Sequence, residues 1–124
     1  MAMANPTSNL ISSENVHGTA VYGAGDSKVG DIDHLMIEKM SGRVTYAVMS
    51  FGGFLGLGNS HYPIPWNALK YDTVLGGYRT GITEQQLQSA PQFSQDSWGN
   101  REWEQRTHKH YGVRPYWDAA VPMI

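Results

Sequence analysis

Hydrophobic positions recur in short segments separated by turn residues over the first two thirds of the chain, and at helical spacing afterwards. Short apolar or alternating runs bounded by Gly, Pro, Asn and Asp are typical of β-strands. They predict six strands, at residues 18–22, 28–38, 43–51, 61–66, 70–75 and 78–82. Strands followed by helices, without βαβ alternation, predict a mainly β domain with a C-terminal α-helical extension.

The second predicted strand has mixed faces. Asp31 and Asp33 share one face with apolar residues, while Ile32 and His34 share the other. Because neither face is uniformly polar or apolar, we predict a bend or bulge near Asp33 and His34. Residues 39–42 follow as a hairpin loop.

The third predicted strand is apolar on both faces, because Tyr46 and Val48 alternate with Ala47 and Met49. A strand with one solvated face normally shows apolar/polar alternation, so both faces of this strand must be covered. Two candidates could cover the outer face: the C-terminal helical segment or a second copy of the chain.

The fourth predicted strand carries two prolines, Pro63 and Pro65, on one face and Tyr62, Ile64 and Trp66 on the other. Proline has no backbone N–H, so two prolines at this spacing prevent a ladder from extending along one edge. This strand is therefore expected at a sheet margin, followed by a single helical turn.

Two helices are predicted in the C-terminal third. Thr83 and Gln86 fit a capping box at the start of a short helix. Asn100 as N-cap and Gly112 at the C′ position bound a second helix over residues 101–111. Its packing stripe at helical spacing consists of Trp103, Thr107, His110 and Tyr111, and His108 is expected to face water.

Length and composition narrow the possibilities. A chain of 124 residues predicts one domain, with a disordered tail at 1–9, a β-domain at 10–82 and a helical extension at 83–124 packed on it. The sequence has no cysteine, which excludes disulfides and fits a reducing, cytoplasmic compartment. The start of the chain has neither a basic nor an apolar signal region, and no apolar run approaches the roughly 18 residues that span a bilayer, so no membrane insertion is expected. The nine Lys and Arg residues are scattered and the net charge is −2, which disfavours nucleic-acid binding.

Two glycine-rich segments lack the further residues that a phosphate-binding loop requires. Residues 52–58 lack the Lys-Ser or Lys-Thr pair of a P-loop, and residues 23–28 carry Lys28 in place of the third glycine of a dinucleotide fingerprint. Tight backbone connections explain both segments better.

Titratable residues give a weak signal for chemistry. Asp31 and Asp33 could share a cation, but two carboxylates fall short of the roughly six oxygens that calcium requires. His34 and His61 could serve as bases, yet no serine lies in a recognisable nucleophile elbow. The sequence therefore assigns no catalytic residue, no metal ligand and no cofactor. The alternative, a small-molecule or metal-ion binding protein with hydrolytic activity, depends on these four residues.

Four segments in order resemble the PRC-barrel family, named for the cytoplasmic domain of the photosynthetic reaction-centre H subunit. They are residues 28–37 (KVGDIDHLMI), 41–48 (SGRVTYAV), 51–58 (FGGFLGLG) and 62–69 (YPIPWNAL). The resemblance covers residues 10–82 and implies a small β-barrel of five or six strands, no catalysis, and a role in docking or assembly. The residues after 83 resemble stand-alone bacterial members.

Two specialised relatives, the reaction-centre H subunit and the ribosome-maturation protein RimM, do not lend their roles to this chain. The first needs an N-terminal membrane helix and the second a separate N-terminal domain, and neither is expected here. We therefore expect a non-enzymatic protein-interaction module with an unidentified protein partner, and a homodimer as its oligomeric state. The apolar candidates for its interface are Met49, Phe51, Phe54, Leu55, Leu57, Tyr62 and Trp66.

Overall fold

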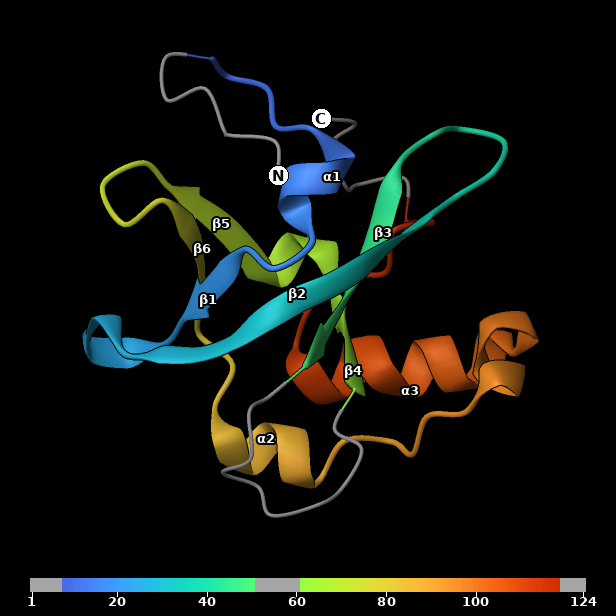
Figure 1. Cartoon of the computed structure of the whole chain (residues 1–124). Coiled ribbons are helices and arrows are strands. Elements are labelled where there is room, and N and C mark those ends of the chain that lie inside the picture. The colour runs from blue at the N-terminus through green and yellow to red at the C-terminus, as the bar shows by residue number, and fades with distance from the viewer. Residues whose placement is uncertain (1–7, 51–60, 119–124) are drawn as a thin grey trace.

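The structure is a computed structural model that describes residues 8–50 and 61–118. Its main element is a strongly curled six-stranded sheet, a half-barrel, with one short helix before it and two helices after it (Figure 1). The prediction of a small β-barrel of five or six strands with a helical C-terminal extension is confirmed.

The strands are β1 (Ala20–Tyr22), β2 (Lys28–Ile37), β3 (Val44–Ser50), β4 (His61–Pro65), β5 (Leu69–Asp72) and β6 (Gly77–Thr80). The helices are α1 (Ser13–Val16), α2 (Glu84–Gln88) and α3 (Arg101–Tyr111), with 3₁₀ turns η1 (Ala24–Asp26), η2 (Trp66–Ala68) and η3 (Gln95–Gly99).

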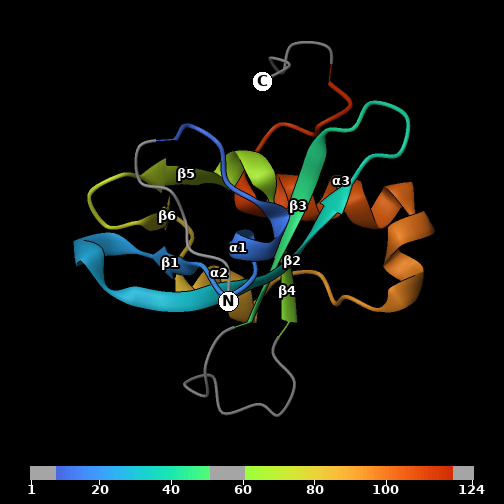
Figure 2. The same ribbon diagram turned by 45° about the horizontal axis from the view of Figure 1, so that its top comes forward.

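The strand order in the sheet is β4-β3-β2-β1-β6-β5. Every neighbouring pair is antiparallel except β1 and β6, which run parallel with Val21 opposite Tyr78. The first strand of the chain therefore lies in the middle of the sheet, between β2 and the last strand (Figure 2).

The predicted bulge in β2 is confirmed. Ile32 pairs with Met49 and His34 pairs with Val48, so Asp33 is an extra residue with no partner of its own in the β3 register. A bulge increases the local twist of a strand. The ten-residue β2 thereby contributes to the curl of the half-barrel.

The proline strand β4 lies at one edge of the sheet, as predicted, and β5 lies at the other. The turn η2 joins these two edge strands directly, so the chain crosses from one margin of the half-barrel to the other within three residues.

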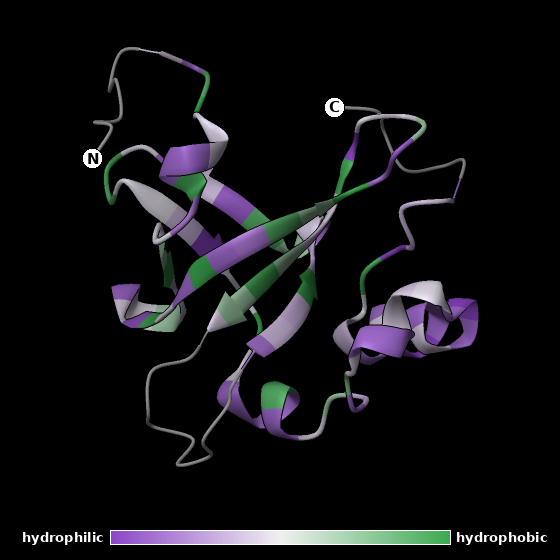
Figure 3. Ribbon diagram, turned by 45° about the vertical axis from the view of Figure 1, so that its right-hand side comes forward, coloured by the Kyte–Doolittle hydropathy of each residue, from purple (hydrophilic) through white to green (hydrophobic). Residues whose placement is uncertain are grey.

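The core fills the inside of the curl. Its buried strand residues are Val21, Ile32, Ala47, Met49, Ile64, Leu69 and Tyr78. In Figure 3 most hydrophobic positions lie on the strands, whereas the ribbon of α3 is largely hydrophilic.

The helix α1 was not predicted. The Ser12 side chain caps it by accepting a hydrogen bond from the backbone N–H of Glu14 at 3.2 Å, and Val16 is 3% exposed against the core. Figures 1 and 2 show α1 lying across one open end of the half-barrel. Within the described ranges, no helix has the length and apolar character needed to cross a bilayer.

Candidate functional site

The long C-terminal helix α3 covers the outer face of the sheet. Its ends follow the predicted signals, since the Asn100 side chain accepts from the N–H groups of Glu102 and Trp103, and Gly112 is left-handed with φ 69°. The capping box of α2 at Thr83 and Gln86 is also confirmed.

The face that α3 buries differs in part from the predicted stripe. The buried residues are Trp103, Glu104, Thr107, His108 and Tyr111. His108 is 2% exposed, so the prediction that it faces water is wrong. It lies four residues after Glu104 and one turn from Tyr111, on the side of the helix that meets β3. His110 is half-buried and donates from Nε2 to the backbone carbonyl of Gln86 at 2.6 Å.

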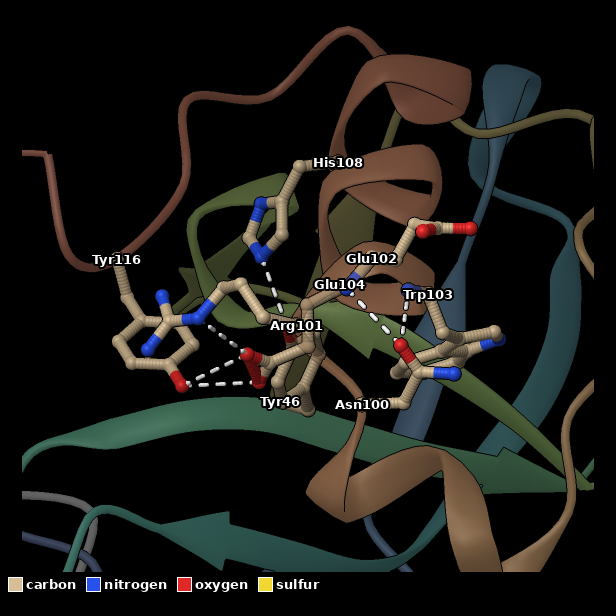
Figure 4. A network of polar contacts seen from close by, with 8 residues as sticks. All are labelled: Tyr46, Asn100, Arg101, Glu102, Trp103, Glu104, His108 and Tyr116. Atoms are coloured by element: carbon tan, nitrogen blue, oxygen red, sulfur yellow. Dashed lines mark hydrogen bonds and ion pairs between the residues drawn. The ribbon is translucent and has the colours of Figure 1, made fainter.

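A polar network connects α3 to β3 (Figure 4). The hydroxyl of Tyr46 lies 3.0 Å from Nε2 of His108. The hydroxyl of Tyr116 donates to both carboxylate oxygens of Glu104, at 2.9 and 3.1 Å. Nε of Arg101 lies 3.5 Å from the same carboxylate, so the buried charge of Glu104 has a cation and a hydroxyl donor as partners.

Burial sets the protonation of this network. Burial raises the pKa of Tyr46, and the nearby Glu104 carboxylate raises it further. Burial also raises the pKa of Tyr116, to about 12, and lowers the pKa of His108. At neutral pH both tyrosines are protonated and His108 is neutral, so the network consists of hydrogen bonds that position α3.

Aromatic rings complete the cover of β3. The ring of Tyr46 lies 5.4 to 6.1 Å, centroid to centroid, from four others, which are Trp98, Trp103, His108 and Tyr116. Of the two candidates for the outer face of the third strand, the C-terminal helical segment is therefore the one that covers it.

Three of the four titratable candidates gather at the bulge in β2. Asp33 accepts from Nδ1 of His34 at 2.6 Å, and its other carboxylate oxygen lies 3.7 Å from Nε2 of His61. His17, which the sequence did not single out, donates from Nδ1 to the backbone carbonyl of Asp33 at 2.6 Å. Asp31 lies apart and pairs with Lys28 at 3.0 Å.

The hydrogen bond from His34 lowers the pKa of Asp33, and the cluster is solvent-accessible, with 37% of the Asp33 side chain exposed. Across residues 8–50 and 61–118, no group of three His, Cys, Asp or Glu side chains could hold a metal ion.

The predicted interface residues are only partly within the described chain. Met49 is 1% exposed and belongs to the core. Tyr62 and Trp66 are half-buried against the same core, and the Trp66 ring packs on Tyr78 at 5.3 Å. The remaining candidates, Phe51, Phe54, Leu55 and Leu57, lie outside the described residues.

Exposed hydrophobic side chains lie instead on three other segments. Those that are large and exposed within the described residues are Leu10 (85%), Ile37 (55%), Met40 (96%), Tyr71 (47%) and Val74 (92%). They lie before α1, at the β2–β3 hairpin and at the β5–β6 hairpin. In both Figure 1 and Figure 2 the β2–β3 hairpin lies to the right and the β5–β6 hairpin to the left, and we use the name hairpin end for these two turns and the segment before α1 together.

Local hydrogen bonds fix the β5–β6 turn. Asp72 Oδ1 accepts from the N–H groups of Val74 and Leu75 at 2.8 and 2.9 Å, and its Oδ2 accepts from Nε of Arg79 at 2.6 Å. These hydrogen bonds hold the pKa of Asp72 below its usual value, and the bond from the Leu75 N–H has the largest effect. The turn that presents Val74 is therefore preformed.

The β2–β3 turn is fixed in a similar way. The N–H of Gly42 donates to the carbonyl of Glu38 at 2.8 Å, with Gly42 at φ 76°, and the Ser41 hydroxyl donates to the Glu38 carboxylate at 2.6 Å. Met40 is thus held at the tip of a defined turn.

A groove of about 830 Å³ lies between the start of β3 and the β5–β6 strands. Among the described residues that line it, three are cationic (Arg43, Lys70 and Arg79) and none is acidic. Arg79 is paired outside the groove with Asp26 at 2.5 Å and with Asp72. We call this feature the basic groove. Sequence reasoning missed it because Lys70 and Arg43 are distant in sequence.

Comparisons with known proteins find a family model and solved structures that match the chain. A family model described as "PRC-barrel domain" matches residues 8–86. Among solved structures, the chain is similar to a 16S ribosomal RNA processing protein, RimM, from Pseudomonas aeruginosa, with a TM-score of 0.40 and 18% identity. That match covers 67% of this chain and 50% of the other, so the chain spans half the length of that protein. No curated protein matches the chain.

Proposed function

The chain belongs to the PRC-barrel domain family, and from this premise we propose that it is a non-enzymatic protein-interaction and assembly module that docks its partner at the hairpin end. The observation that carries the proposal is that preformed turns hold large apolar side chains exposed to solvent. Large apolar side chains that a rigid turn presents to solvent are candidates for association sites. Met40 and Val74, each more than nine-tenths exposed, would be the main apolar contacts.

The basic groove indicates the chemistry of the partner. Lys70 is exposed, and the groove carries no carboxylate among its described lining residues. A partner segment with acidic side chains beside apolar ones would complement both features. We place this interaction in the cytoplasm, because a chain without cysteine cannot form disulfides and so does not require an oxidising compartment.

Within the histidine cluster, Asp33 itself is poorly suited to act as a general base. An efficient general base has a pKa near the working pH. The pKa of Asp33 is instead lowered, so its carboxylate is a weak base at neutral pH.

The homodimer remains a prediction, but one reason for it, the need to cover the outer face of β3, no longer applies. The outer face of β3 is covered by α3 of the same chain, so it does not require a second copy. Light scattering at micromolar concentration measures the mass directly: 13.8 kDa for a monomer, or twice that for a dimer.

The docking proposal is tested by affinity capture from native lysate, followed by reconstitution with the purified partner. The hairpin-end variant carries Met40→Glu and Val74→Glu, and a matched control carries the same added charge at two exposed helix positions, Gln88→Glu and Gln105→Glu. We expect the variant to bind the partner at least about tenfold more weakly, since apolar hot-spot residues typically contribute 1.4 kcal/mol or more. Equal binding by the variant and the wild type would exclude the hairpin end as the docking surface.

A further inference from the structure

We propose that the free edge of β5 pairs with β5 of a second copy of the chain, so that two half-barrels share one continuous sheet across a two-fold axis. The inference rests on the homodimer predicted above and assigns its surface. β5 pairs with β6 alone and forms one margin of the sheet. An unpaired strand edge presents a row of backbone N–H and C=O groups that another strand can bind.

The two edges of the sheet differ in their capacity to bind another strand. β4 contains Pro63 and Pro65 within its five residues, so that edge lacks the donors that a further strand would need. β5 (Leu69–Asp72) contains no proline. Its Lys70 and Tyr71 are exposed, the tyrosine at 47%. Strand addition is therefore opposed at β4 and open at β5.

The outward-facing backbone groups of β5 belong to Tyr71. The N–H of Leu69 donates to the carbonyl of Trp66, so it does not point toward β6. Hydrogen-bonded and non-hydrogen-bonded pairs alternate along an antiparallel ladder, so Tyr71, two residues further on, also turns its N–H and C=O away from β6. The Tyr71 ring lies 5.1 Å from that of Tyr78 directly opposite, which fits the closer spacing of a non-hydrogen-bonded pair. Among the described residues, no loop or turn group bonds to this N–H or C=O, so both are available to a further strand.

The charges on β5 select a two-fold register. With Tyr71 opposite Tyr71, the two residues exchange both of their backbone hydrogen bonds, and Lys70 of each copy lies opposite Asp72 of the other. A register centred on Lys70 or on Asp72 would instead place like charges directly opposite each other, which destabilises a sheet. Self-pairing is therefore favoured in the register centred on Tyr71.

Both charged residues have the capacity for this pair. Lys70 is exposed and forms no ion pair with the described residues. The Asp72 carboxylate accepts from the N–H groups of Val74 and Leu75 and from Arg79, but a carboxylate has about four acceptor sites, so one remains for an ammonium group. A lysine on an edge strand normally opposes pairing. Here Asp72 of the second copy would offset that charge.

Sedimentation equilibrium on the purified chain, from micromolar to millimolar concentration, tests the dimer. The wild type should approach twice the chain mass of 13.8 kDa as the concentration rises. Lys70→Glu places carboxylates opposite each other on both sides of the axis, and we expect it to weaken dimerisation at least about tenfold. Lys109→Glu, at an exposed position of α3, makes the same change in net charge and should dimerise like the wild type.

These measurements separate the edge from the homodimer itself. A wild type that stays monomeric up to millimolar concentration would overturn both. A dimer that Lys70→Glu and Lys109→Glu affect equally would leave the homodimer in place and overturn the β5 edge.

Hydrogen exchange shows directly whether the edge is paired. Raising the concentration from below to above the dissociation constant should slow exchange of the Tyr71 amide at least about fivefold, because a paired N–H exchanges only when the ladder opens. The Leu69 amide, already bonded to Trp66, is the internal control and should change little. If the Tyr71 amide exchanges equally fast in the monomer and the dimer, the second copy does not bind at this edge.

Discussion

The hydroxyl of Tyr46, in the middle of β3, lies 3.0 Å from Nε2 of His108 in α3, 62 residues further along the chain. Both side chains are almost completely buried, at 1% and 2% exposure. This contact joins the sheet to its C-terminal cover through polar groups that have no access to water. It makes the attachment of α3 specific as well as hydrophobic.

Replacing Tyr46 by Phe should destabilise the protein by about 1–3 kcal/mol, the usual effect of leaving a buried partner unsatisfied. The variant keeps the ring and its packing but removes the hydroxyl next to His108 and Glu104. Denaturant unfolding followed by circular dichroism measures the change. Tyr71→Phe, at a 47% exposed position, is the control and should stay within about 0.5 kcal/mol of wild type. Equal effects of the two substitutions would contradict the role given to the network.

Stability should decrease as the pH falls below about 6.5. Burial lowers the pKa of His108 from its usual 6.5, so the unfolded chain takes up this proton at a higher pH than the folded protein does. Protonation therefore favours the unfolded state, and the free energy of unfolding is highest above pH 6.5.

Melting temperatures between pH 8 and pH 5 measure this dependence. The variant His108→Gln, which cannot titrate there, should show a flatter profile than the wild type even if it is less stable throughout. The pKa values of Asp33 and Asp72 are also lowered, but they affect stability in a different pH range. The stability that these carboxylates contribute is lost only below about pH 3.8. A wild-type profile and a variant profile of equal slope would show that His108 is not the responsible group.

Gly77→Ala should be strongly destabilising. A Cβ at this position would lie 2.5 Å from the backbone oxygen of Ala20 and 2.9 Å from the ring of Tyr22, where β6 meets β1. Since the first obstacle is backbone, the strands must separate, and we expect a loss of about 2 kcal/mol or more. Gly81→Ala, where nothing lies within 4 Å, is the matched control and should be near neutral. Urea unfolding measures the difference in stability between the two variants. Equal midpoints would mean that β1 and β6 do not approach so closely.

Asn100→Ala should weaken α3 by removing its N-cap. The side chain accepts from two backbone N–H groups, at 3.0 and 3.2 Å, and loss of such a cap typically costs about 1 kcal/mol. The exposed Gln105→Ala substitution, in the same helix, should be neutral or slightly stabilising because alanine is the better helix former. Thermal unfolding compares the two, and a cap variant as stable as the Gln105 variant would argue against this helix start.

Local signals in the sequence predicted most of the fold. The double apolar face of β3, the bulge at Asp33, the edge position of the proline strand and the caps of α2 and α3 each depend on neighbouring residues only, and each was confirmed. The helix α1 was missed because four residues are too few for a helical period.

Features that depend on distant residues were not predictable in this way. The prediction that His108 faces solvent is wrong because its partner Tyr46 is far away in sequence. Helical spacing alone does not show which face of a helix meets a sheet. The basic groove has both Lys70 and Arg43 in its lining because the sheet curls and η2 joins its two edge strands, which periodicity does not encode. Candidate interface residues were chosen by apolarity, and for Met49 the same property places the side chain in the core.

The parallel pairing of β1 with β6 also has a consequence for the order in which the protein can be completed. Val21, which is fully buried, lies opposite Tyr78, so a nascent chain leaves its first strand without one neighbour until β6 has been synthesised. The β2–β3 hairpin can form early because its contacts are local, whereas the β1–β6 pair must close a long loop. We therefore expect this pair to be the slow step of folding, and the interval before it closes to be when the newly made protein is most exposed to aggregation.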